Sequence, residues 1–466
     1  MINNDLGWIY SALVNVFLVF CLVVMVMPAG KIRMGDPDSK PEYSFISWLT
    51  MMFSAGMGIG LIYWSVAEPL KHYAMPPLGE GFTPFAMTQS LNWTFMHWGL
   101  HTWAIYVMLG MALGLFSFRH HLPFTIRTSL WGLLPKPLVA TAGNAIDVLA
   151  VLGTLFGVAT SLGLGVMQLN AGLNRLLGVP DDIWVQIVLI VGITAVATMS
   201  VISGIGKGIK WLSNFNMFLG TALFLLVFLL GPAQWLINQF GVNVWHYLQH
   251  ISTVGLQVGT FENMEWKSQW TNFYWGWWIS WSPFVGLFMA RISKGRTLRE
   301  FILGAMLVPT VLTFTWIHVF GGAALYFESV QHIPLVQMMG DNISSSLFVL
   351  FAQLPFGFIL SVLGMLALFT FFVTSSDSGS LVIDMITAGG DPNPPVVQKV
   401  FWAVLEGFVA IILLLMGGLN TLQTAAICMG FPFALMLLLV FINLIRYFFS
   451  DHAGEIQSAA KEVTTT

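Results

Sequence analysis

One hydrophobic segment contains the run Tyr274-Trp275-Gly276-Trp277-Trp278-Ile279-Ser280-Trp281-Ser282-Pro283-Phe284. At about 100° per residue of an α-helix, six aromatic side chains of this segment fall within an arc of roughly 140°. They are Phe273, Tyr274, Trp277, Trp278, Trp281 and Phe284. A one-sided wall of aromatic rings attracts a cation that has no N–H to donate, as in quaternary ammonium recognition. Interfacial tryptophans or ordinary packing are the alternatives, and the stripe by itself leaves both readings open.

The composition identifies a membrane protein with many spans. The chain has 466 residues, of which 57% are hydrophobic and only 8% are charged, whereas soluble domains carry about 25% charged residues. The net charge of −3 is too small to indicate a nucleic-acid partner. The two cysteines, Cys21 and Cys428, lie in apolar runs and form no disulfide framework.

Hydropathy predicts eleven membrane-spanning helices. Their approximate limits are residues 6–28, 46–70, 88–117, 140–176, 181–203, 209–237, 268–291, 298–327, 356–385, 398–417 and 422–449. Two segments between spans, 244–256 and 329–350, are amphipathic and are expected at the membrane interface.

The basic residues support this count and give an orientation. If the N-terminus lies outside and the spans alternate, 15 of the 18 Lys and Arg residues fall on the cytoplasmic side. The three on the outer side are Lys71, Arg175 and Lys267. Such a split follows the positive-inside rule, so we expect an external N-terminus and a cytoplasmic C-terminus.

Two spans carry helix-breaking residues five helices apart. The second span contains Gly56-Met57-Gly58-Ile59-Gly60, and the seventh contains Ser282-Pro283. Unwound backbone at membrane depth is tolerated where it lines a cavity or is buried in protein. A five-helix unit repeated once must invert, which predicts two inverted repeats that each start with a broken helix. This pattern indicates a transporter with its site near the bilayer midplane.

The predicted organisation has five parts. Residues 1–42 form a peripheral N-terminal helix and a cytoplasmic loop, and residues 450–466 form a short cytoplasmic tail. The first repeat covers 43–238, an amphipathic connection covers 239–267, and the second repeat covers 268–449.

The third span offers a second aromatic set, Trp98, Trp103 and Tyr106, which could share one broad helical face. General packing is the alternative. His97 and His101 stand four residues apart on that helix, as in zinc sites, but a third ligand and a Glu after the first His are missing. We therefore expect hydrogen-bonded structural histidines there.

The ninth span contains Phe371-Phe372-Val373-Thr374-Ser375-Ser376-Asp377-Ser378. Adjacent hydroxyls beside a free carbonyl suit a dehydrated Na⁺, although they also serve as contacts between helices. Three acidic residues, Asp147, Asp377 and Glu406, lie at membrane depth and are functional candidates by default. Capping or helix pairing is at least as good an explanation for Asp147 and Glu406. We find no catalytic set and do not expect an enzyme.

Three motifs together resemble the betaine/choline/carnitine transporter family. They are Met52-Phe53-Ser54-Ala55-Gly56-Met57-Gly58-Ile59-Gly60 with Glu68-Pro69, then Phe273 through Gly286, then Ala290-Arg291-Ile292-Ser293. The resemblance extends from about residue 6 to residue 449. It implies an all-α, leucine-transporter-type 5+5 inverted-repeat fold with a broken first helix in each repeat, and a homotrimer. Family members typically have one more N-terminal helix, which this chain is expected to lack.

The resemblance also implies roles for individual residues. The substrate box would comprise Trp98, Trp103, Tyr106, Trp277, Trp278 and Trp281. Ala55, Gly56 and Gly58 would supply unwound backbone near the substrate carboxylate, and Phe273 and Phe288 would be gates. Sodium would be held by the carbonyls of Ser54, Met57 and Phe371 and the hydroxyls of Thr374 and Ser375. A second sodium site would map to Thr154, Phe284 and Val158, but Val158 has no side-chain oxygen where sodium-coupled members carry threonine.

We therefore expect an inner-membrane importer of glycine betaine or a similar quaternary ammonium solute, working by Na⁺ symport and alternating access. Na⁺ is the coupling ion, and no other cofactor is expected. Proton-coupled choline members often have Asp at the position of Gly60, so Gly60 favours a zwitterion with sodium. The alternatives are a proton-coupled or sodium-independent carrier of choline, carnitine or a related onium compound, or a channel.

Overall fold

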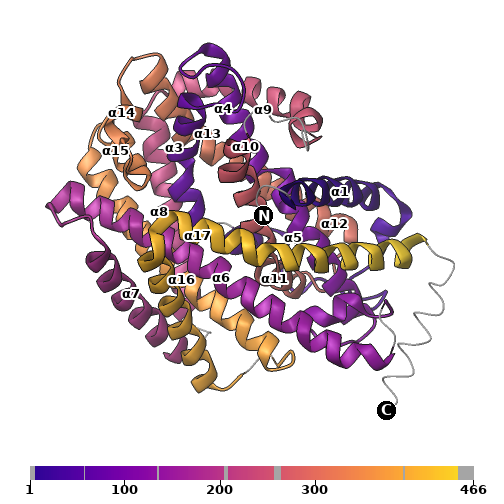
Figure 1. Cartoon of the computed structure of the whole chain (residues 1–466). Coiled ribbons are helices and arrows are strands. Elements are labelled where there is room, and N and C mark those ends of the chain that lie inside the picture. Colours follow the sequence, from indigo (N-terminus) through magenta and orange to yellow (C-terminus); the bar gives the residue numbers. More distant parts are fainter. Residues whose placement is uncertain are drawn as a thin grey trace.

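The structure is a computed structural model that describes residues 6–56, 58–133, 136–203, 208–256, 264–391 and 394–449 (Figure 1). Its elements are α1 (Gly7–Val26), η2 (Pro28–Lys31), α2 (Phe45–Gly56), α3 (Ile59–Ala74), α4 (Pro84–Trp98), α5 (Leu100–Leu113), η3 (Gly114–Arg119), η4 (Ile126–Leu130), α6 (Lys136–Leu177), α7 (Ile183–Ser203), α8 (Gly208–Leu230), α9 (Ala233–Leu256), α10 (Met264–Lys267), η5 (Ser268–Asn272), α11 (Phe273–Ile292), α12 (Leu298–Ile302), η6 (Leu303–Leu307), α13 (Val308–Ser329), α14 (Leu335–Met339), η7 (Ile343–Ser345), α15 (Ser346–Phe351), α16 (Gly357–Thr387) and α17 (Val396–Phe449). Within the described ranges the sole β-type pairing is an isolated bridge between Arg33 and Thr297. The predicted all-α class is confirmed.

Each of the eleven predicted spans coincides with helix. By length and apolar composition, seven helices of the described part could cross a membrane, or eight if the bent pair α8 and α9 counts as one. The seven treat α17 as one helix, although it contains two predicted spans. Gly417 and Gly418 interrupt it with non-helical backbone, and Gly418 has φ 58° and ψ −132°, a conformation that side chains disfavour.

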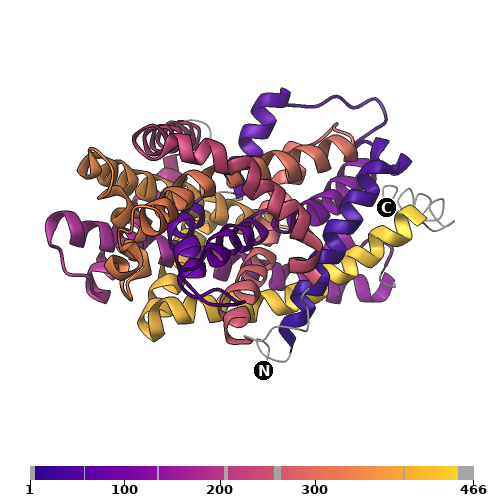
Figure 2. The same cartoon turned by 90° about the horizontal axis from the view of Figure 1, so that it is seen from above.

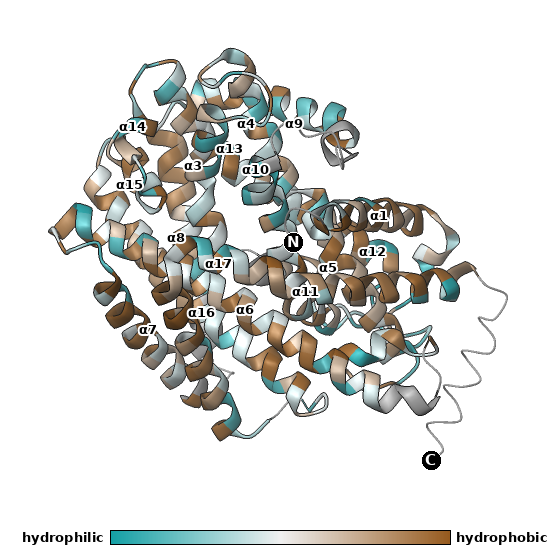
Figure 3. Ribbon diagram, in the orientation of Figure 1, coloured by the Kyte–Doolittle hydropathy of each residue, from teal (hydrophilic) through white to brown (hydrophobic). Residues whose placement is uncertain are grey.

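Hydrophobic residues make up most of the helical ribbon in Figure 3, and hydrophilic residues occur in connecting segments and on helices such as α9. On α7, Val188 is 70% exposed and Met199 is 61% exposed. A soluble protein would not leave such a patch in water, whereas lipid tails accept it. The chain is therefore a multi-pass membrane protein.

Two predicted boundaries are wrong around the connection between the repeats. The sixth span ends at Leu230 and not at residue 237, because Gly231 and Pro232 follow it and proline cannot donate to the preceding turn. The chain then bends by 108° into α9, which starts at Ala233 and so is longer than the predicted segment 244–256. Segment 329–350 forms the short elements α14, η7 and α15.

The predicted interruption at Ser282-Pro283 takes a different form, since α11 runs without a break from Phe273 to Ile292. Pro283 has no N–H for the carbonyl of Ile279. The Ser282 hydroxyl donates to that carbonyl at 2.7 Å and replaces the missing hydrogen bond. The irregular part of this span lies instead at its start, where η5 is a π-helix.

Helix α11 lies at the centre of the molecule. All its residues are buried except Phe288 and Arg291, and it contacts α5, α6 and α17. Helix α3 packs against α4 and α13, while α16 packs against α6, α7 and α8. Figure 2 shows α1 beside the C-terminal part of α17 at one edge of the bundle. Segments of both predicted repeats therefore meet around α11.

Candidate functional site

The predicted break in the second span is confirmed. Helix α2 ends at Gly56 and α3 begins at Ile59, and between them Gly58 has the non-helical angles φ −156° and ψ −138°. Such helix ends leave backbone carbonyls and N–H groups without helical partners. Met57 lies outside the described residues. Ser54, Ala55 and Gly56 lie in the last turn of α2, where the structure describes the backbone alone.

Glycine at this break allows close contact with two other helices. A Cβ atom on Gly60 would lie 2.5 Å from Cη2 of Trp277, and one on Gly58 would lie 3.2 Å from Oγ of Ser375. A side chain at position 60 would therefore displace the Trp277 indole. The start of α3 thus adjoins both the aromatic stripe of α11 and the hydroxyl motif of α16.

Four of the predicted box tryptophans are in ring contact. The centroid of Trp98 lies 4.9 Å from that of Trp278 and 6.4 Å from that of Trp277, in edge-to-face geometry. Trp277 and Trp278 stack at 4.6 Å, and Trp281 lies 6.4 Å from each of them. All four are at most 4% exposed. We call Trp98, Trp277, Trp278 and Trp281 the aromatic cluster.

The structure does not bring the other two predicted box residues into this cluster. Trp103 and Tyr106 contact each other at 5.8 Å, and within the described part neither ring contacts Trp98 or the α11 tryptophans. The prediction assumed one continuous helix, but α4 ends at Trp98 and Gly99 has φ −100° and ψ −139°. Trp98 and Trp103 therefore lie on different helices, and the shared helical face predicted for them does not exist. Trp275 turns toward His97 and His101 and away from the cluster.

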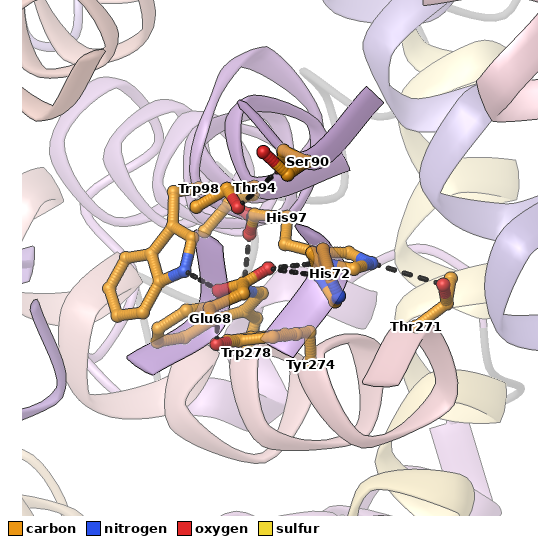
Figure 4. Close-up of polar contacts among 10 residues, drawn as sticks. Glu68, His72, Ser90, Thr94, His97, Trp98, Thr271, Tyr274 and Trp278 are labelled. Atoms are coloured by element: carbon orange, nitrogen blue, oxygen red, sulfur yellow. Dashed lines mark hydrogen bonds and ion pairs between the residues drawn. The ribbon is translucent and has the colours of Figure 1, made fainter. Parts of the chain in front are cut away.

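A buried carboxylate holds the cluster in place, as Figure 4 shows. Glu68 of α3 is fully buried and accepts four hydrogen bonds. Its Oε2 accepts from Trp98 Nε1 at 2.8 Å and from the Tyr274 hydroxyl, and its Oε1 accepts from His97 Nδ1 at 2.7 Å and His72 Nε2 at 3.1 Å. This one side chain therefore joins α3, α4 and α11. The motif Glu68-Pro69 was visible in the sequence, but its partners were not.

The helix break at Gly99 supplies a second anchor. The carbonyl of His97 is free of the helix ladder and accepts from Trp278 Nε1 at 2.8 Å and from the Thr102 hydroxyl at 2.6 Å. The indole N–H groups of Trp98 and Trp278 therefore point to fixed acceptors. By contrast, the indole N–H groups of Trp277 and Trp281 are buried without a hydrogen-bond partner in the described structure.

The histidines of the third span are hydrogen-bonded, as expected. Besides Glu68, His97 contacts Thr271 Oγ1 at 3.0 Å through Nε2, and His101 contacts Asn15 Oδ1 at 3.2 Å. Metal-ligand atoms of Glu68, His72 and His97 lie within 4.8 Å of one another. Those of Glu68 and His97 are already engaged in the hydrogen bonds above, so the group serves as a hydrogen-bond network.

Among the predicted sodium residues of α16, Ser375 lies beside the break in the second span. Ser375 adjoins Gly58, and the Thr374 hydroxyl donates to the carbonyls of Thr370 and Phe371, both at 3.1 Å. The structure adds Asn216 of α8, which donates to Thr374 Oγ1 at 2.8 Å. A cavity of about 300 Å³ adjoins this point and is lined in part by Gly58, Asn216 and Phe371. No sequence motif marked Asn216.

The residues of the doubtful second sodium site lie on α6 and α11, which are in contact. Thr154 is buried and its hydroxyl has no hydrogen-bond partner in the described structure. Phe284 contacts Trp281 at 5.5 Å, and Val158 faces Gly379 of α16. Val158 therefore contributes packing between α6 and α16.

The two predicted gate residues lie toward opposite ends of α11. Phe273 is fully buried and stacks on Trp277 at 5.3 Å. Phe288 is only partly buried, and 15 residues of helix separate the two by about 22 Å. Asp147 accepts from the Arg127 backbone N–H at 3.0 Å and from its guanidinium, which agrees with a pairing role for that acid.

Comparisons with known proteins agree with these features. A family model described as the betaine/carnitine/choline family transporter matches residues 1–453. "Glycine betaine transporter OpuD" of Bacillus subtilis is 41% identical over 463 residues, covering 99% of this chain and 90% of the relative. "Glycine betaine transporter 1" of Vibrio parahaemolyticus is 44% identical, covering 95% and 86%. "Uncharacterized transporter Rv0917" of Mycobacterium tuberculosis is 46% identical, covering 97% and 77%.

A solved structure supports the predicted fold. A Na⁺-coupled sialic acid symporter in a substrate-bound, outward-open state matches with a TM-score of 0.50 at 15% identity, covering 98% of this chain and 96% of that one. At this identity the likeness concerns the fold alone, and it confirms the leucine-transporter-type architecture. Because the family model matches nearly the whole length, the chain belongs to the betaine/carnitine/choline family of membrane transporters.

Proposed function

We propose that this protein imports glycine betaine, or a close quaternary ammonium analogue, together with Na⁺ by alternating access. The aromatic cluster is the observation that carries the proposal. A trimethylammonium group has no N–H, so neither a hydrogen bond nor a fixed geometry with a carboxylate can select it. Ring faces attract such a cation, and each desolvated contact contributes about 2 kcal/mol, without strict additivity.

The hydrogen bonds of the cluster support this role. Trp98 and Trp278 turn their N–H groups toward Glu68 and the His97 carbonyl, so their orientations are fixed before a ligand arrives. A preorganised site loses less side-chain entropy when it binds. Glu68 also places a buried acidic group at the N–H edge of the Trp98 indole, and an acidic group there favours a positive charge nearby.

Buried donors near the cluster suit the carboxylate of a betaine. Trp277 Nε1 and Trp281 Nε1 have no hydrogen-bond partner among the described residues, and neither does the hydroxyl of Tyr106, which lies outside the cluster. Unwound backbone at the Gly58 break adds N–H groups that an anionic group can use. We propose Ala55, Gly56 and Gly58 as that backbone, and Trp103 and Tyr106 as residues that join the box when the substrate is bound.

Sodium coupling is supported by the junction of α2, α3 and α16. Ser375 lies beside the Gly58 break, and Thr374 precedes it on α16, so an ion held by these hydroxyls and by the break would couple the two predicted repeats. We propose that the carbonyls of Ser54, Met57 and Phe371 complete this site. One Na⁺ moving through 100 mV yields about 2.3 kcal/mol, which supports about 40-fold accumulation of a neutral betaine.

The second candidate is a proton-coupled or sodium-independent carrier of choline or carnitine. The packing at Gly60 disfavours the proton-coupled choline pattern, because an Asp there would collide with Trp277. We further propose a homotrimer in the inner membrane with the N-terminus outside. The distribution of basic residues supports the orientation.

The test is uptake of radiolabelled glycine betaine by purified protein in liposomes, with Na⁺ or K⁺ outside. We expect uptake when Na⁺ is outside and no uptake when K⁺ replaces it. Equal uptake in the two buffers would refute sodium coupling. Counterflow without Na⁺ would identify an exchanger, and dependence of uptake on pH would identify a proton-coupled carrier. Steady single-channel currents would identify a channel.

The box is tested separately with Trp277→Leu and Trp281→Leu, each expected to weaken betaine binding by about 30-fold. Trp184→Leu is the matched control, because Trp184 is 70% exposed on α7. Wild-type affinity in both box variants would refute the assignment.

A further inference from the structure

Three carboxyl groups in the second repeat are buried without the partners that such groups normally have. Asp377 and Asp384 of α16 and Glu406 of α17 are at most 1% exposed. Within the described residues, Oδ1 of Asp377, both oxygens of Asp384 and Oε1 of Glu406 accept no hydrogen bond. No described Lys, Arg or His side chain forms a direct ion pair with any of the three, although Lys399 attracts Asp384 from a longer distance. A buried acid in a membrane-spanning helix is costly unless it is neutralised, so these groups need a cation or a proton.

The acids continue from the proposed sodium site. At about 100° per residue, Thr374, Asp377 and Asp384 fall within an arc of about 80° on α16. At 1.5 Å per residue, this face runs for about 15 Å from Thr374 to Asp384. Asp384 lies one turn before the end of α16 at Thr387. The connection that follows falls on the cytoplasmic side of the predicted topology, and Lys399 lies just after it in the first turn of α17.

Glu406 of α17 contacts α16 beside Asp377. Its Oε2 accepts from the Ser376 hydroxyl at 3.1 Å, and its Oε1 lies 3.2 Å from where a Cβ of Gly379 would be. The absence of a side chain at Gly379 therefore leaves room for that oxygen. On the facing helix α7, Ser200 donates to Asp377 Oδ2 at 2.7 Å, and the buried hydroxyl of Thr194 has no hydrogen-bond partner in the described structure.

We propose that Asp377, Glu406 and Asp384 form a sodium relay that carries the ion from Thr374 and Ser375 to the cytoplasm. The relay rests on the proposed Na⁺ symport and extends it to the release step. Carboxylate and hydroxyl oxygens are hard ligands that suit a dehydrated alkali cation. The oxygens are spread along the helix and not gathered at one point, which suits successive transient sites better than one tight site.

The test uses wild type, Asp384→Asn and Glu406→Gln in liposomes, with Ser361→Ala as the control. Ser361 lies on α16 with Asp384, and its hydroxyl donates to the backbone carbonyl of Gly357 one turn earlier. Two quantities are measured: Na⁺-dependent betaine binding by tryptophan fluorescence, and net betaine uptake at several internal Na⁺ concentrations. We expect binding within about threefold of wild type in both acid variants, and net uptake at least about tenfold slower.

A purely structural role would not change the response to internal Na⁺. We expect internal Na⁺ to inhibit wild-type uptake, and the half-inhibiting concentration to change at least about fivefold in both acid variants. Asp384→Glu keeps the carboxylate and is expected to restore uptake. Asp384→Asn and Glu406→Gln proteins with wild-type uptake and inhibition would overturn the relay alone. If betaine binding by the wild type does not depend on Na⁺, the symport and the relay are both overturned. If uptake depends on a pH gradient instead, the three acids carry protons and not Na⁺.

Discussion

Glu68 and Asp384 are both fully buried carboxyl groups in membrane-spanning helices, but their surroundings are opposite. Four donors from α3, α4 and α11 converge on Glu68 (Figure 4), whereas neither carboxyl oxygen of Asp384 has a hydrogen-bond partner in the part of the chain that the structure describes. The cost of burying a carboxylate falls when donors are fixed around it and remains when they are absent.

The difference separates two uses of buried charge in one molecule. Glu68 has its hydrogen-bonding capacity filled within the protein, so it positions Trp98 and Tyr274 and has little capacity left for an ion. Both oxygens of Asp384, and one oxygen each of Asp377 and Glu406, lack a donor within the described residues, so a cation that passes through can be their partner. The hydrogen bonds to Glu68 fix the orientation of Trp98 and Tyr274. The oxygens of Asp377, Glu406 and Asp384 would instead bind a passing ion weakly and in succession.

The largest expected effect comes from removing the fully bonded charge. Glu68→Gln places an amide NH₂ against donors, so the free energy of unfolding should fall by about 3 kcal/mol. Chemical denaturation in detergent measures this change. Glu42→Gln is the control, because Glu42 is 46% exposed and should cost less than about 0.5 kcal/mol. A loss below about 1 kcal/mol in Glu68→Gln would contradict the positioning role.

Gly60→Ala tests whether the start of α3 shapes the aromatic cluster. Its Cβ would lie 2.5 Å from Trp277, so the ring must move. One displaced cation–π partner corresponds to about 2 kcal/mol, or about 30-fold weaker betaine binding in a fluorescence titration. Gly192→Ala on α7 is the matched control, since no atom lies within 4 Å of a Cβ there. Equal affinity in the two variants would sink the proposed contact.

Trp98→Phe keeps an aromatic ring but removes the N–H that donates to Glu68. Losing a hydrogen bond to a charged group should lower the free energy of unfolding by about 1.5 kcal/mol. Trp103→Phe removes an indole N–H that has no hydrogen-bond partner in the described structure, so its effect should be smaller. The same denaturation series measures both, and the reverse order would show that Glu68 does not anchor the cluster through Trp98.

The smallest effect on stability is expected at the unsatisfied acid. Asp384→Asn removes no hydrogen bond, so the free energy of unfolding should stay within about 0.5 kcal/mol of wild type or rise. Asp147→Asn is the comparison, because Asp147 is paired with Arg127 and should lose about 1 kcal/mol. Thermal unfolding of both variants checks the order. A large loss in Asp384→Asn would mean that Asp384 has a structural partner after all.

Local features of the sequence predicted much of the fold. Hydropathy located the spans because about 20 consecutive apolar residues are needed to cross a bilayer. The glycines at positions 56, 58 and 60 predicted the break between α2 and α3, since weak helix formers act locally. The side of α11 that carries Trp277, Trp278 and Trp281 followed from helical periodicity.

The predictions about helix breaks were wrong where a hydrogen bond from a neighbouring side chain, or a single glycine, decided whether the helix continued. Pro283 did not break α11 because the Ser282 hydroxyl replaced the missing hydrogen bond. Gly99 did break the third span, which separated Trp103 and Tyr106 from the cluster. The sequence placed Asn216 and Glu68 on helices, but their partners lie on elements far along the chain.

Sequence alone thus determined the membrane class, the spans and the aromatic face of α11, because hydropathy and helical period depend on neighbours within a few turns. Tertiary structure alone decided which buried polar groups are satisfied. Glu68 and Asp384 look alike in the sequence, and only the packing of α4 and α11 around the first supplies the donors that the second lacks. Hydrogen bonds act over about 3 Å, so their pattern is set by the fold and not by the order of residues.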